Sequence, residues 1–587
     1  MTKKNKKNAL IPAAVIDPEP CKEPKSLLIG VIGLAVVLLV FFSGKAFNID
    51  DPLFIWTARQ ILHHPLDFCG FTVNWYTSSM PMAEVTKNPP LASFFAAPVI
   101  ALFGESEIAL HLAFLLPLVI LIIGEYRLAG KFCPQPLLAT AAMVWTPVFL
   151  VSGATVMCDI LMLCFWVWAI VFWIEGIERV HYGYLAAAAA AIAGSALSKY
   201  FGLSLLPLLF AYTLVRRRAA GSRRRAGTTA GKPSVPQASP FNLSLALLLP
   251  VGVLGGYNIL TRRLYGHGLL TEAVSYAQNF QPFVNGSPLL KCIIGLSFAG
   301  GCLISVLFFL PVLRSKLLPV TFGAVFLTAV AFLSASDGVG IIAPDTGHGS
   351  LGVIMQMSIF IAAAGAMIHL AILDAIHYRD HGSWLLLLWI AGTFAFACFF
   401  NWSINGRSML PLAPALGILI ARRIATGKDP SKGSLRLLLP LMPAVAMSLL
   451  VVWADVAFAN SQRSAAELFT RDYAGRRDHV SFEGHWGFQY YLQRSGLQPV
   501  PVVTDARGSR LNVQRGDLLI EPTNNSNVGF VPSSLTESVK TVTFTACPFL
   551  TTMNRAAGAG FYAHQCGPLP FAFGKVPPET YTVKAFR

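Results

Sequence analysis

The sequence predicts an all-α, polytopic membrane protein that carries a small mixed α/β domain at its C-terminus. Of its 587 residues, 54% are hydrophobic and only 13% are charged, whereas ordinary globular domains carry about 25% charged residues. The apolar residues recur in runs of about 18–24, which are long enough to cross a hydrocarbon core as helices. Residues 457–587 break this pattern, so we expect a separate polar domain there.

Thirteen apolar runs are candidates for transmembrane helices. The first begins at Ser26, behind a polar tail of residues 1–25 that contains four prolines and that we expect to be disordered in the cytoplasm. The runs on either side of Lys199 are short, so distorted or re-entrant helices are expected there. The expected spans lie near residues 26–43, 107–124, 134–151, 156–175, 184–198, 200–215, 241–260, 288–312, 317–334, 351–374, 384–400, 408–425 and 435–456.

The distribution of positive charge predicts the orientation. Lys and Arg concentrate in cytoplasmic loops, and thirteen spans place the cluster Arg216–Arg225 on the same side as the N-terminal lysines. Counting Pro90–Phe103 as a further span would put that cluster outside, so we expect this short run to lie in the membrane interface. The plasma (inner) membrane is the expected location, with a cytoplasmic N-terminus and an extracytoplasmic domain at residues 457–587.

That C-terminal domain shows the sequence pattern of a mixed α/β fold. Short strand-like runs predict strands at residues 517–520 and 541–545, and Trp486–Arg494 is expected to be a helix. Cys547 and Cys566 could form a disulfide outside the cytoplasm.

Composition argues against two other classes of protein. A formal charge of +16 is compatible with a nucleic-acid partner. Much of the excess, however, flanks apolar runs, as topology signals do, so no nucleic acid is expected. The cysteines lack metal-ligand spacing, and His63, His64 and His348 belong to no spaced ligand set. We therefore expect no metal-ligating residues, although a divalent cation is left open as a cofactor.

Polar residues gather at the expected outer ends of the spans. An acidic pair and several cations occupy the first outer loop, residues 44–105, and further charges lie at the outer ends of later spans. A carboxylate near an acceptor hydroxyl or amine can act as a general base, and cations can hold a departing phosphate. The candidates are Asp50 and Asp51 as catalytic residues, and Arg59, Lys87, Asn88, Asp159, Lys199 and Arg407 as substrate-binding residues.

The order of these motifs resembles the GT-C glycosyltransferases, and within them the superfamily of protein O-mannosyltransferases and aminoarabinose transferases (glycosyltransferase 39-like). The resemblance covers roughly residues 26–425. It rests on the acidic pair, Lys-Asn-Pro-Pro-Leu from Lys87, Asp159 at the head of a span, Ser-Lys-Tyr around Lys199, and Gly-Arg-Ser-Met-Leu-Pro around Arg407.

The resemblance implies a GT-C fold and an inverting sugar transfer from a polyprenyl-phosphate donor at the outer face. The acceptor would be a protein, a lipid such as lipid A, or a glycan, and membrane lipids would surround the site. Asp50 matches the catalytic acidic position of the first loop, and Asp51 stands where the family commonly has Glu. Asp159, Lys199 and Arg407 match polar positions of the family, the cations serving the donor phosphate. Lys87 and Asn88 stand where aminoarabinose transferases have an acidic residue and a Lys.

Other interpretations of the same residues remain open. The acidic pair, followed by Pro52, could cap an interfacial helix. Lys87 and Lys199 could reach the lipid headgroups, and Asp159 could simply pair with a nearby cation. A transporter or flippase of an anionic or lipid-linked substrate is the rival function, and a non-catalytic relative that binds a partner through its outer domain is a third. The one-sided charges and the lack of an internal repeat favour the glycosyltransferase.

Overall fold

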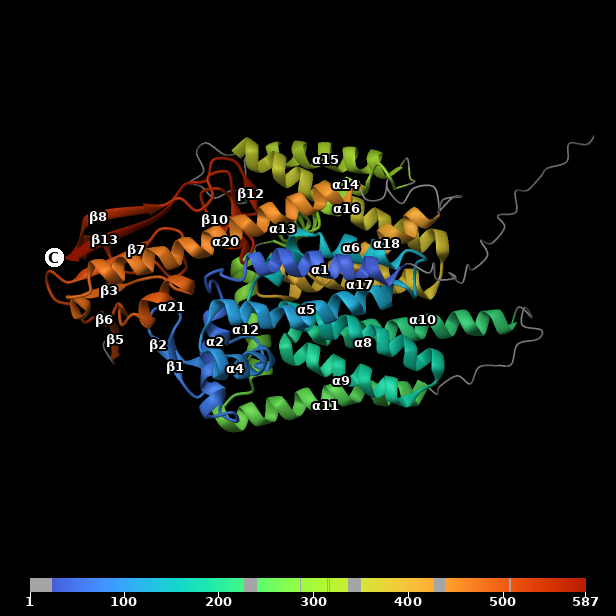
Figure 1. Cartoon of the computed structure of the whole chain (residues 1–587), viewed down its shortest axis with the longest axis horizontal. Helices are drawn as coiled ribbons and strands as arrows, with labels where there is room; N and C mark the ends of the chain where they lie inside the picture. The colour runs from blue at the N-terminus through green and yellow to red at the C-terminus, as the bar shows by residue number, and fades with distance from the viewer. Residues whose placement is uncertain are drawn as a thin grey trace, which may run out of the picture.

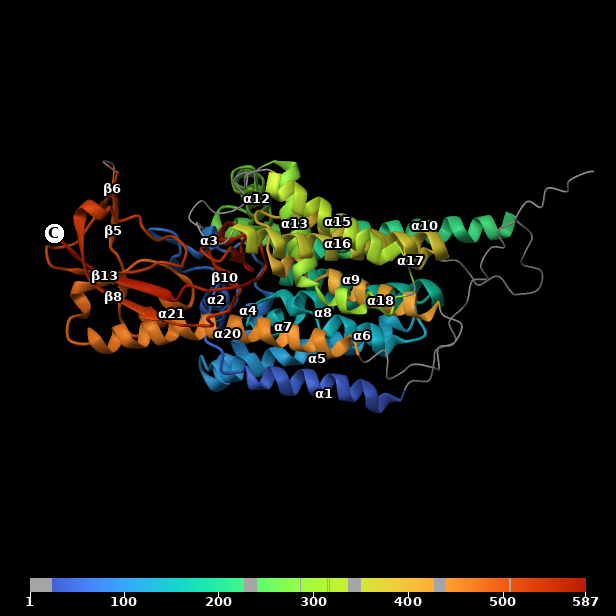
Figure 2. The ribbon, with the colours of Figure 1, turned by 90° about the horizontal axis from the view of Figure 1, so that it is seen from above.

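A helical bundle with a β-sheet region at one end makes up the molecule (Figures 1 and 2). The computed structural model describes residues 24–225, 240–285, 287–313, 315, 317–335, 350–426, 439–505 and 508–587. The tail expected to be disordered, residues 1–25, lies almost entirely outside the described residues.

The bundle contains the apolar runs found in the sequence. Its helices are α1 (Lys25–Phe41), α5 (Glu107–Ala129), α6 (Pro136–Val144), α7 (Pro147–Gly153), α8 (Asp159–Arg179), α9 (Tyr182–Ser198), α10 (Leu205–Arg225), α11 (Pro240–Tyr265), α13 (Pro288–Cys302), α14 (Ser305–Phe309), α15 (Leu317–Ala335), α16 (Ser350–Tyr378), α17 (His381–Ala395), α18 (Leu412–Ala425) and α20 (Leu441–Asp472).

Six helices within the described residues are long and apolar enough to cross a membrane. They are α5, α8, α15, α16, α20 and the helix formed by α17 with the π-turn η2 (Phe396–Phe400). A seventh span results if α6 and α7, which meet at 68°, are counted as one, and α1, α9 and α13 are apolar but shorter. The protein is therefore a multi-pass membrane protein, and the number thirteen stays a prediction.

Local sequence explains the breaks in the bundle. Thr146 caps α7 by accepting a hydrogen bond from the Phe149 amide, and Pro147 at the first helical position has no N–H to continue α6. Lys199 is extended between α9 and the 3-10 turn η1 (Tyr200–Ser204), which is the distortion expected from the short runs beside it. The expected span at 288–312 is not one helix, because a turn at Leu303 separates α13 from α14.

Large apolar side chains remain exposed on the outer surface of the bundle. Ile29 is 68% exposed, Leu327 67% and Phe41 84%. Soluble monomers rarely leave so much apolar surface in water, so this surface is the one that contacts lipid.

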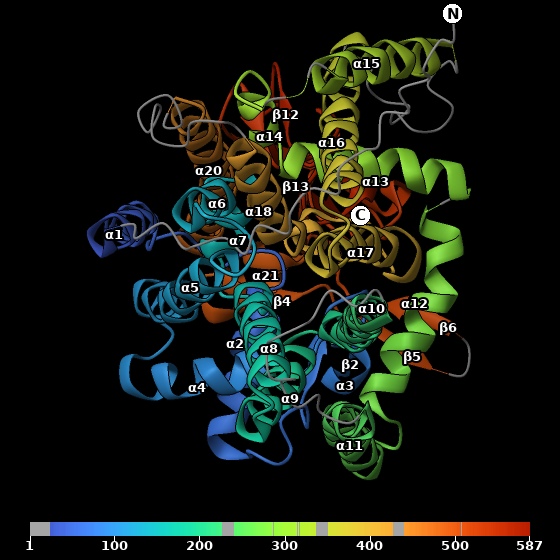
Figure 3. The same cartoon turned by 90° about the vertical axis from the view of Figure 1, so that its right-hand side faces the viewer.

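The first loop folds into a compact layer between the bundle and the sheet region. It contains α2 (Asp51–His63), the antiparallel hairpin of β1 (Thr72–Asn74) and β2 (Ser79–Pro81), α3 (Met82–Val85) and α4 (Leu91–Phe103). Figure 3 shows α4 from the side, whereas α1, α5 and α8 are seen nearly along their axes. The 13 residues of α4 extend about 20 Å, short of the ~30 Å hydrocarbon core. Its length and direction support the expected interfacial position.

A single helix joins the bundle to the sheet region. The expected boundary between residues 456 and 457 falls inside α20, which continues without a break to Asp472. Ala465, Ala466 and Phe469 at its far end pack in the same core as strands of the sheet. The polar domain is therefore attached to the bundle by a continuous helix.

The polar region contains a mixed five-stranded sheet in the order β4-β3-β7-β13-β8. The expected strand at 517–520 is β7 and that at 541–545 is part of β8, while the expected helix is α21 with the same bounds, Trp486–Arg494. Strand β3 runs parallel to β4 and β7, and β13 is antiparallel to β7 and β8. The strands of this region are β3 (Val480–Phe482), β4 (Gln498–Pro499), β5 (Val502–Asp505), β6 (Gly508–Leu511), β7 (Leu518–Pro522), β8 (Thr536–Phe544), β9 (Leu550–Thr551), β10 (Met553–Asn554), β11 (Ala559–Gly560), β12 (Ala572–Phe573) and β13 (Glu579–Phe586).

The two cysteines of this region do not form the disulfide that an outside location would allow. Cys547 and Cys566 are both free thiols, the first buried and the second half-buried.

Candidate active site

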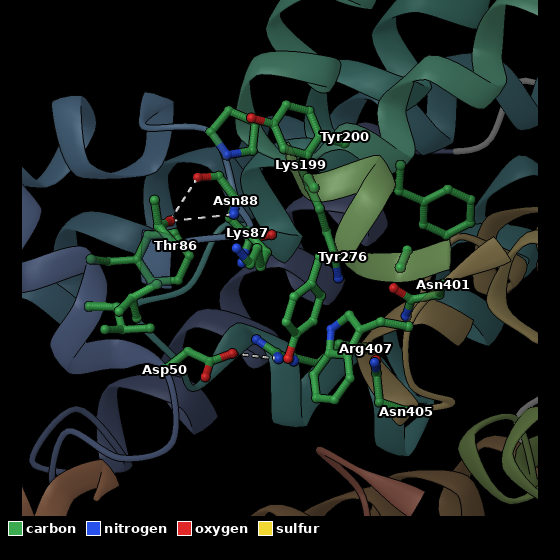
Figure 4. Close-up of a pocket in the computed structure, with 18 of the residues that line it drawn as sticks. Asp50, Thr86, Lys87, Asn88, Lys199, Tyr200, Tyr276, Asn401, Asn405 and Arg407 are labelled. Atoms are coloured by element: carbon green, nitrogen blue, oxygen red, sulfur yellow. Dashed lines mark hydrogen bonds and ion pairs between the residues drawn. The ribbon is translucent and has the colours of Figure 1, made fainter. Parts of the chain in front are cut away.

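A cavity of about 560 Å³ lies where the first loop, the bundle and the C-terminal region meet. It is lined by residues of the first loop, of the junction after α9, of α12 (Leu269–Asn285), of the segment between α17 and α18, and of the C-terminal region. Five of the eight sequence candidates line it, namely Asp50, Lys87, Asn88, Lys199 and Arg407. Figure 4 shows Lys87, Lys199 and Tyr276 reaching toward the space beside the Asp50–Arg407 pair.

The two adjacent carboxylates of the acidic pair point to different environments. Asp50 lines the cavity with its side chain 24% exposed. Asp51 is completely buried and accepts hydrogen bonds from the backbone amides of Asn48 (3.0 Å) and Val156 (2.9 Å). Burial raises the pKa of Asp51 to about 6. Asp50 can therefore contact a substrate, and Asp51 connects the start of α2 to the segment before α8.

The backbone in front of the pair explains this divergence. Ile49 is a buried, β-branched residue with φ of 53°, a conformation that such residues rarely adopt. Asp50 is the N-cap of α2, and Asp51 and Pro52 form its first turn, as the capping interpretation expected, although no cap bond from the Asp50 side chain forms. The Asp50 carboxylate is thus left available to the cavity.

Four alternating charges form a chain beside and beneath the cavity. Arg407 Nη2 lies 2.6 Å from Asp50 Oδ2, and Arg407 Nη1 lies 3.7 Å from Asp159 Oδ2. Lys199 Nζ lies 2.7 Å from Asp159 Oδ1. Asp159 itself is fully buried at the first position of α8 and does not line the cavity. The chain joins four segments that are far apart in the sequence, and its net charge is zero.

The loop that carries Arg407 is held rigidly. The Asn405 side chain accepts a hydrogen bond from the Ser408 amide and begins the 3-10 turn η3 (Gly406–Met409). Gly406 donates its amide to the Phe561 carbonyl at 2.6 Å, and a Cβ at this glycine would lie 2.6 Å from the Phe561 ring. The ring of Tyr562 lies 5.6 Å from the Arg407 guanidinium. The C-terminal region therefore builds one wall of the site.

A buried ion pair supports that wall. Lys45 Nζ lies 2.6 Å from Asp455 Oδ2, and both side chains are 2% exposed. Asp455 also accepts hydrogen bonds from Tyr562 Oη (3.0 Å) and Thr552 Oγ1 (2.8 Å). Asp455 belongs to α20, so one carboxylate ties together the first loop, the last helix and the C-terminal region.

Lys87 and Asn88 lie on the opposite side of the cavity. Lys87 Nζ donates to the Glu84 carbonyl (2.7 Å), pairs with Glu272 (3.2 Å) and lies 4.7 Å above the ring of Tyr276. Burial lowers the pKa of Lys87. Asn88 is fixed through its backbone, which exchanges hydrogen bonds with Thr86 Oγ1. This arrangement presents an ammonium group and an amide to the cavity.

Arg59 does not reach this cavity. Its Nε lies 2.7 Å from Glu105 Oε1, its side chain is 52% exposed, and it lines a separate cavity on another face of α2. Two further outer-side cations, Arg262 and Arg263, are exposed at the end of α11 and do not line the cavity either.

Several lining residues were not expected from the sequence. Tyr276 belongs to α12, a helix in a stretch where the sequence predicts no span. Glu272 of the same helix pairs with Lys87 but does not itself line the cavity. Asn401 and Asn405 precede Arg407 by a few positions, so the polar run Asn-Trp-Ser-Ile-Asn between two apolar runs was a usable signal. Tyr562 gave no signal, because only the fold brings the C-terminal region to the cavity.

The side chains present do not fit a divalent metal. Within the part of the chain that the structure describes, no group of three or more His, Cys, Asp and Glu side chains could hold a metal ion. At the cavity, Asp50 and Asp159 face Arg407 and Lys199, and Glu272 faces Lys87. A carboxylate already paired with a cation is a poor ligand for Mg²⁺ or Ca²⁺. His348 lies outside the described residues.

A family of known proteins matches a segment that contains four of the eight candidate residues. Residues 87–228, about a quarter of the chain, match the family described as dolichyl-phosphate-mannose-protein mannosyltransferase. The resemblance to GT-C glycosyltransferases is confirmed. The matched segment contains Lys87, Asn88, Asp159 and Lys199. With the apolar helices, it supports a membrane glycosyltransferase that uses a lipid-linked donor.

Two kinds of solved structure are similar to this chain. The archaeal oligosaccharyltransferase AglB from Archaeoglobus fulgidus, in complex with an inhibitory peptide and a dolichol-phosphate, is 14% identical with a TM-score of 0.45, over 80% of this chain and 60% of its own. ArnT from Cupriavidus metallidurans, bound to undecaprenyl phosphate, is 14% identical with a TM-score of 0.40, over 81% of this chain and 86% of its own. This chain thus covers less than two thirds of AglB. No curated protein sequence matches.

The buried pair of Lys199 and Asp159 should matter for stability. Lys199→Gln leaves the fully buried Asp159 without its nearest cation, and breaking such a pair lowers the free energy of unfolding by about 3 kcal/mol. We expect a lower thermal midpoint in detergent for Lys199→Gln and partial recovery in the double variant with Asp159→Asn. The control is Lys540→Gln, whose side chain is 51% exposed and whose ion pair should contribute less than about 1 kcal/mol. Equal midpoints for Lys199→Gln and the control would contradict the prediction.

Asp51 should make stability depend on pH in a definite direction. Its folded pKa of about 6 lies above the ordinary value of 3.8, so between these values the folded state binds the proton more tightly than the unfolded state. The contribution of Asp51 is present below pH ~4 and is lost as the pH rises through ~6, by on the order of 3 kcal/mol. The difference in thermal midpoint between the wild type and Asp51→Asn should therefore shrink from pH 4.5 to pH 7. A difference that grows over this range would contradict the buried environment of Asp51.

Proposed function

We propose that this protein transfers a sugar, with inversion, from a polyprenyl-phosphate donor to a hydroxyl or amine of an envelope acceptor at the outer face of the membrane. The observation that carries the proposal is that one half-buried carboxylate, Asp50, lines a cavity together with three cations, Lys87, Lys199 and Arg407. A protein, a lipid such as lipid A, or a glycan could supply the accepting group.

The three cations form the positively charged part of the cavity, which would bind the donor phosphate. Arg407 can form two parallel hydrogen bonds to phosphate oxygens, and Lys199 is connected to it through Asp159. Lys87, on the far side of the cavity, forms an ion pair with Glu272 and a cation–π contact with the ring of Tyr276. A phosphate that binds here replaces Asp50 as the partner of Arg407.

Asp50 then acts as the general base. Its carboxylate takes the proton from the acceptor O–H or N–H, and the acceptor atom attacks the anomeric carbon from the side opposite the phosphate. The new bond to the anomeric carbon forms as the bond to the phosphate oxygen breaks, and the electron pair leaves with the phosphate. The phosphate gains one negative charge while Asp50 loses one, so the total charge of the site stays constant during the step.

The lining also accommodates the lipid part of the donor. Leu270, Ala273, Val274 and Ala277 of α12, together with Phe400, give the cavity an apolar side next to its charged side. A polyprenyl chain can follow this apolar side into the membrane while the phosphate stays near Arg407. Asp51, which does not line the cavity, would act by holding the first turn of α2 in place.

The base assignment is tested by two isosteric variants. Asp50→Asn should lower the turnover of protein reconstituted in vesicles by about 10²–10⁴-fold, because general-base catalysis contributes that much. Asp51→Asn should be less stable but retain transfer, and Asp472→Asn, on the exposed end of α20, is the matched control. Transfer is measured as sugar released from the lipid donor and recovered on the acceptor.

Undiminished turnover in Asp50→Asn would refute the assignment of Asp50 as the base. Movement of the lipid-linked substrate across the vesicle membrane without a covalent product would instead favour the transporter or flippase.

The proposed topology has a separate test. With thirteen spans and a cytoplasmic N-terminus, the sheet region lies on the extracytoplasmic side of the membrane and the C-terminal end of α8 on the cytoplasmic side. A cysteine introduced at Glu537, 71% exposed, should react with a membrane-impermeant maleimide in intact cells. A cysteine at Arg179, 62% exposed, should react only after lysis. The native thiols of the described residues are buried or half-buried, so the Cys21→Ser variant serves as the background for both introduced cysteines. Labelling of both introduced cysteines in intact cells would contradict the topology.

A further inference from the structure

A second cavity of about 540 Å³ lies beside the candidate active site, on another face of α2. Trp56, Arg59, Gln60 and His63 of α2 line it, with residues of the β1–β2 hairpin, Gln493 at the end of α21 and residues 498–502 around β4. Its volume falls in the range of ligand sites, ~300–1,000 Å³. None of the proposed catalytic steps uses it.

Helical periodicity in α2 separates the two cavities. Asp50 and, within α2, Leu53, Phe54 and Thr57 line the first, whereas the residues at positions 56, 59, 60 and 63 line the second. Each set follows the i, i+3, i+4, i+7 spacing of one helix face, and at 3.6 residues per turn the two faces lie about 120° apart. The β1–β2 hairpin takes part in both walls, through Trp75 and Tyr76 in the first and Thr72–Asn74 in the second.

The wall between the cavities is preformed. Side chains of the C-terminal region bind three consecutive carbonyls of the hairpin: Gln489 that of Asn74 (2.6 Å), Asn527 that of Trp75 (3.0 Å) and His485 that of Tyr76 (2.8 Å).

Contacts also hold the α2 side chains that line the second cavity. Glu105 accepts hydrogen bonds from Arg59 (2.7 Å) and from Tyr490 Oη (2.6 Å). The half-buried Trp56 contacts Trp75 and Tyr490 at ring-centroid distances of 6.1 and 6.3 Å. A ligand would therefore meet side chains that are already in place, which lowers the ordering cost of binding.

The side chains that line the second cavity indicate the class of ligand that would bind there. Trp56 offers an aromatic surface, the amides of Gln60, Gln493 and Gln498 both donate and accept hydrogen bonds, and no carboxylate lines the cavity. This combination suits a ring with an apolar face and many hydroxyl groups. We propose that the second cavity is a binding subsite for the glycan portion of an extended acceptor.

The strand at the rim argues against a peptide. Peptides commonly bind by adding a strand to a sheet edge, and β4 is an edge strand of the five-stranded sheet. However, Pro499 and Pro501 have no amide N–H, and the amide between them, that of Val500, already donates to the Phe482 carbonyl. This edge has no amide donor to offer an added strand at these positions.

The inference rests on the proposed glycosyl transfer and specifies its acceptor. A glycan of three or more sugars, bound in the second cavity, would reach around the hairpin to present its end to Asp50. It also assigns Arg59 to acceptor binding, since Arg59 faces this cavity and not the first one.

Binding of the full-length protein in detergent to an array of oligosaccharides tests the subsite. The protein should bind oligosaccharides of three or more sugars, and Trp56→Ala and Gln498→Ala should each lower that binding at least tenfold. The matched controls are Trp453→Ala, on the lipid side of α20, and Gln514→Ala, in an exposed loop, both of which should bind as the wild type does. Asp50→Asn should also retain binding, because it lies outside the second cavity.

The outcomes separate this inference from the proposed function. Absence of binding to any oligosaccharide on the array, or binding unaffected by Trp56→Ala, overturns the subsite even if sugar transfer is demonstrated. Selective capture of Ser/Thr-containing peptides on a parallel array, lost in Trp56→Ala, overturns the glycan as ligand. Oligosaccharide binding that follows the expected pattern stands even if Asp50→Asn leaves transfer unchanged, and that result would refute only the base.

Discussion

The ion pair between Arg407 and Asp50 is the interaction on which the organisation of the site depends. It joins a loop near the end of the bundle to the first turn of the first-loop helix, across 357 residues of sequence. Through Asp159 the same guanidinium is linked to Lys199 in the break after α9. A buried charge is costly unless it is paired, so each of these four segments is constrained by the others. The cavity forms in the space that the four segments surround.

The same pairing explains why the charged side chains of the site sum to zero and yet suit an anion. Arg407 and Lys199 are balanced by Asp50 and Asp159, and Lys87 by Glu272. In the proposed mechanism, a donor phosphate would compete with Asp50 for Arg407 and release the carboxylate toward the acceptor. Binding of the donor would therefore free the Asp50 carboxylate to act as the base. Donor binding would then precede deprotonation of the acceptor in every turnover.

The C-terminal region forms part of the cavity wall, which its sequence did not predict. Tyr562 lies against Arg407 and is held by Asp455, and the Phe561 carbonyl receives the amide of Gly406. Gln489, His485 and Asn527 hold the first-loop hairpin by its carbonyls. The continuous helix α20 carries this region into contact with the bundle, so the polar domain forms part of the cavity wall.

Local patterns in the sequence predicted much of this structure. The length of the apolar runs predicted the helices. Charges placed near span ends pointed to Asp50, Lys87, Lys199 and Arg407, all of which line the cavity, because burying charge in a membrane is costly enough to make each exception informative. The different environments of Asp50 and Asp51 could not be predicted, because they depend on Ile49 at positive φ and on an amide at Val156, 105 residues away. Tyr562 and Tyr276 were missed for a related reason: a single aromatic residue carries no signal of its own, and only tertiary contacts bring the C-terminal region and α12 to the cavity.

The affinity of the Asp50→Asn variant for undecaprenyl phosphate, measured in detergent against the wild type, tests the central claim most directly. If Asp50 and the phosphate compete for Arg407, removing the carboxylate's charge frees the guanidinium, and the variant should bind the lipid phosphate severalfold more tightly while Arg407→Lys binds it more weakly. An Asp50→Asn variant that binds the lipid phosphate no more tightly than the wild type would contradict the account.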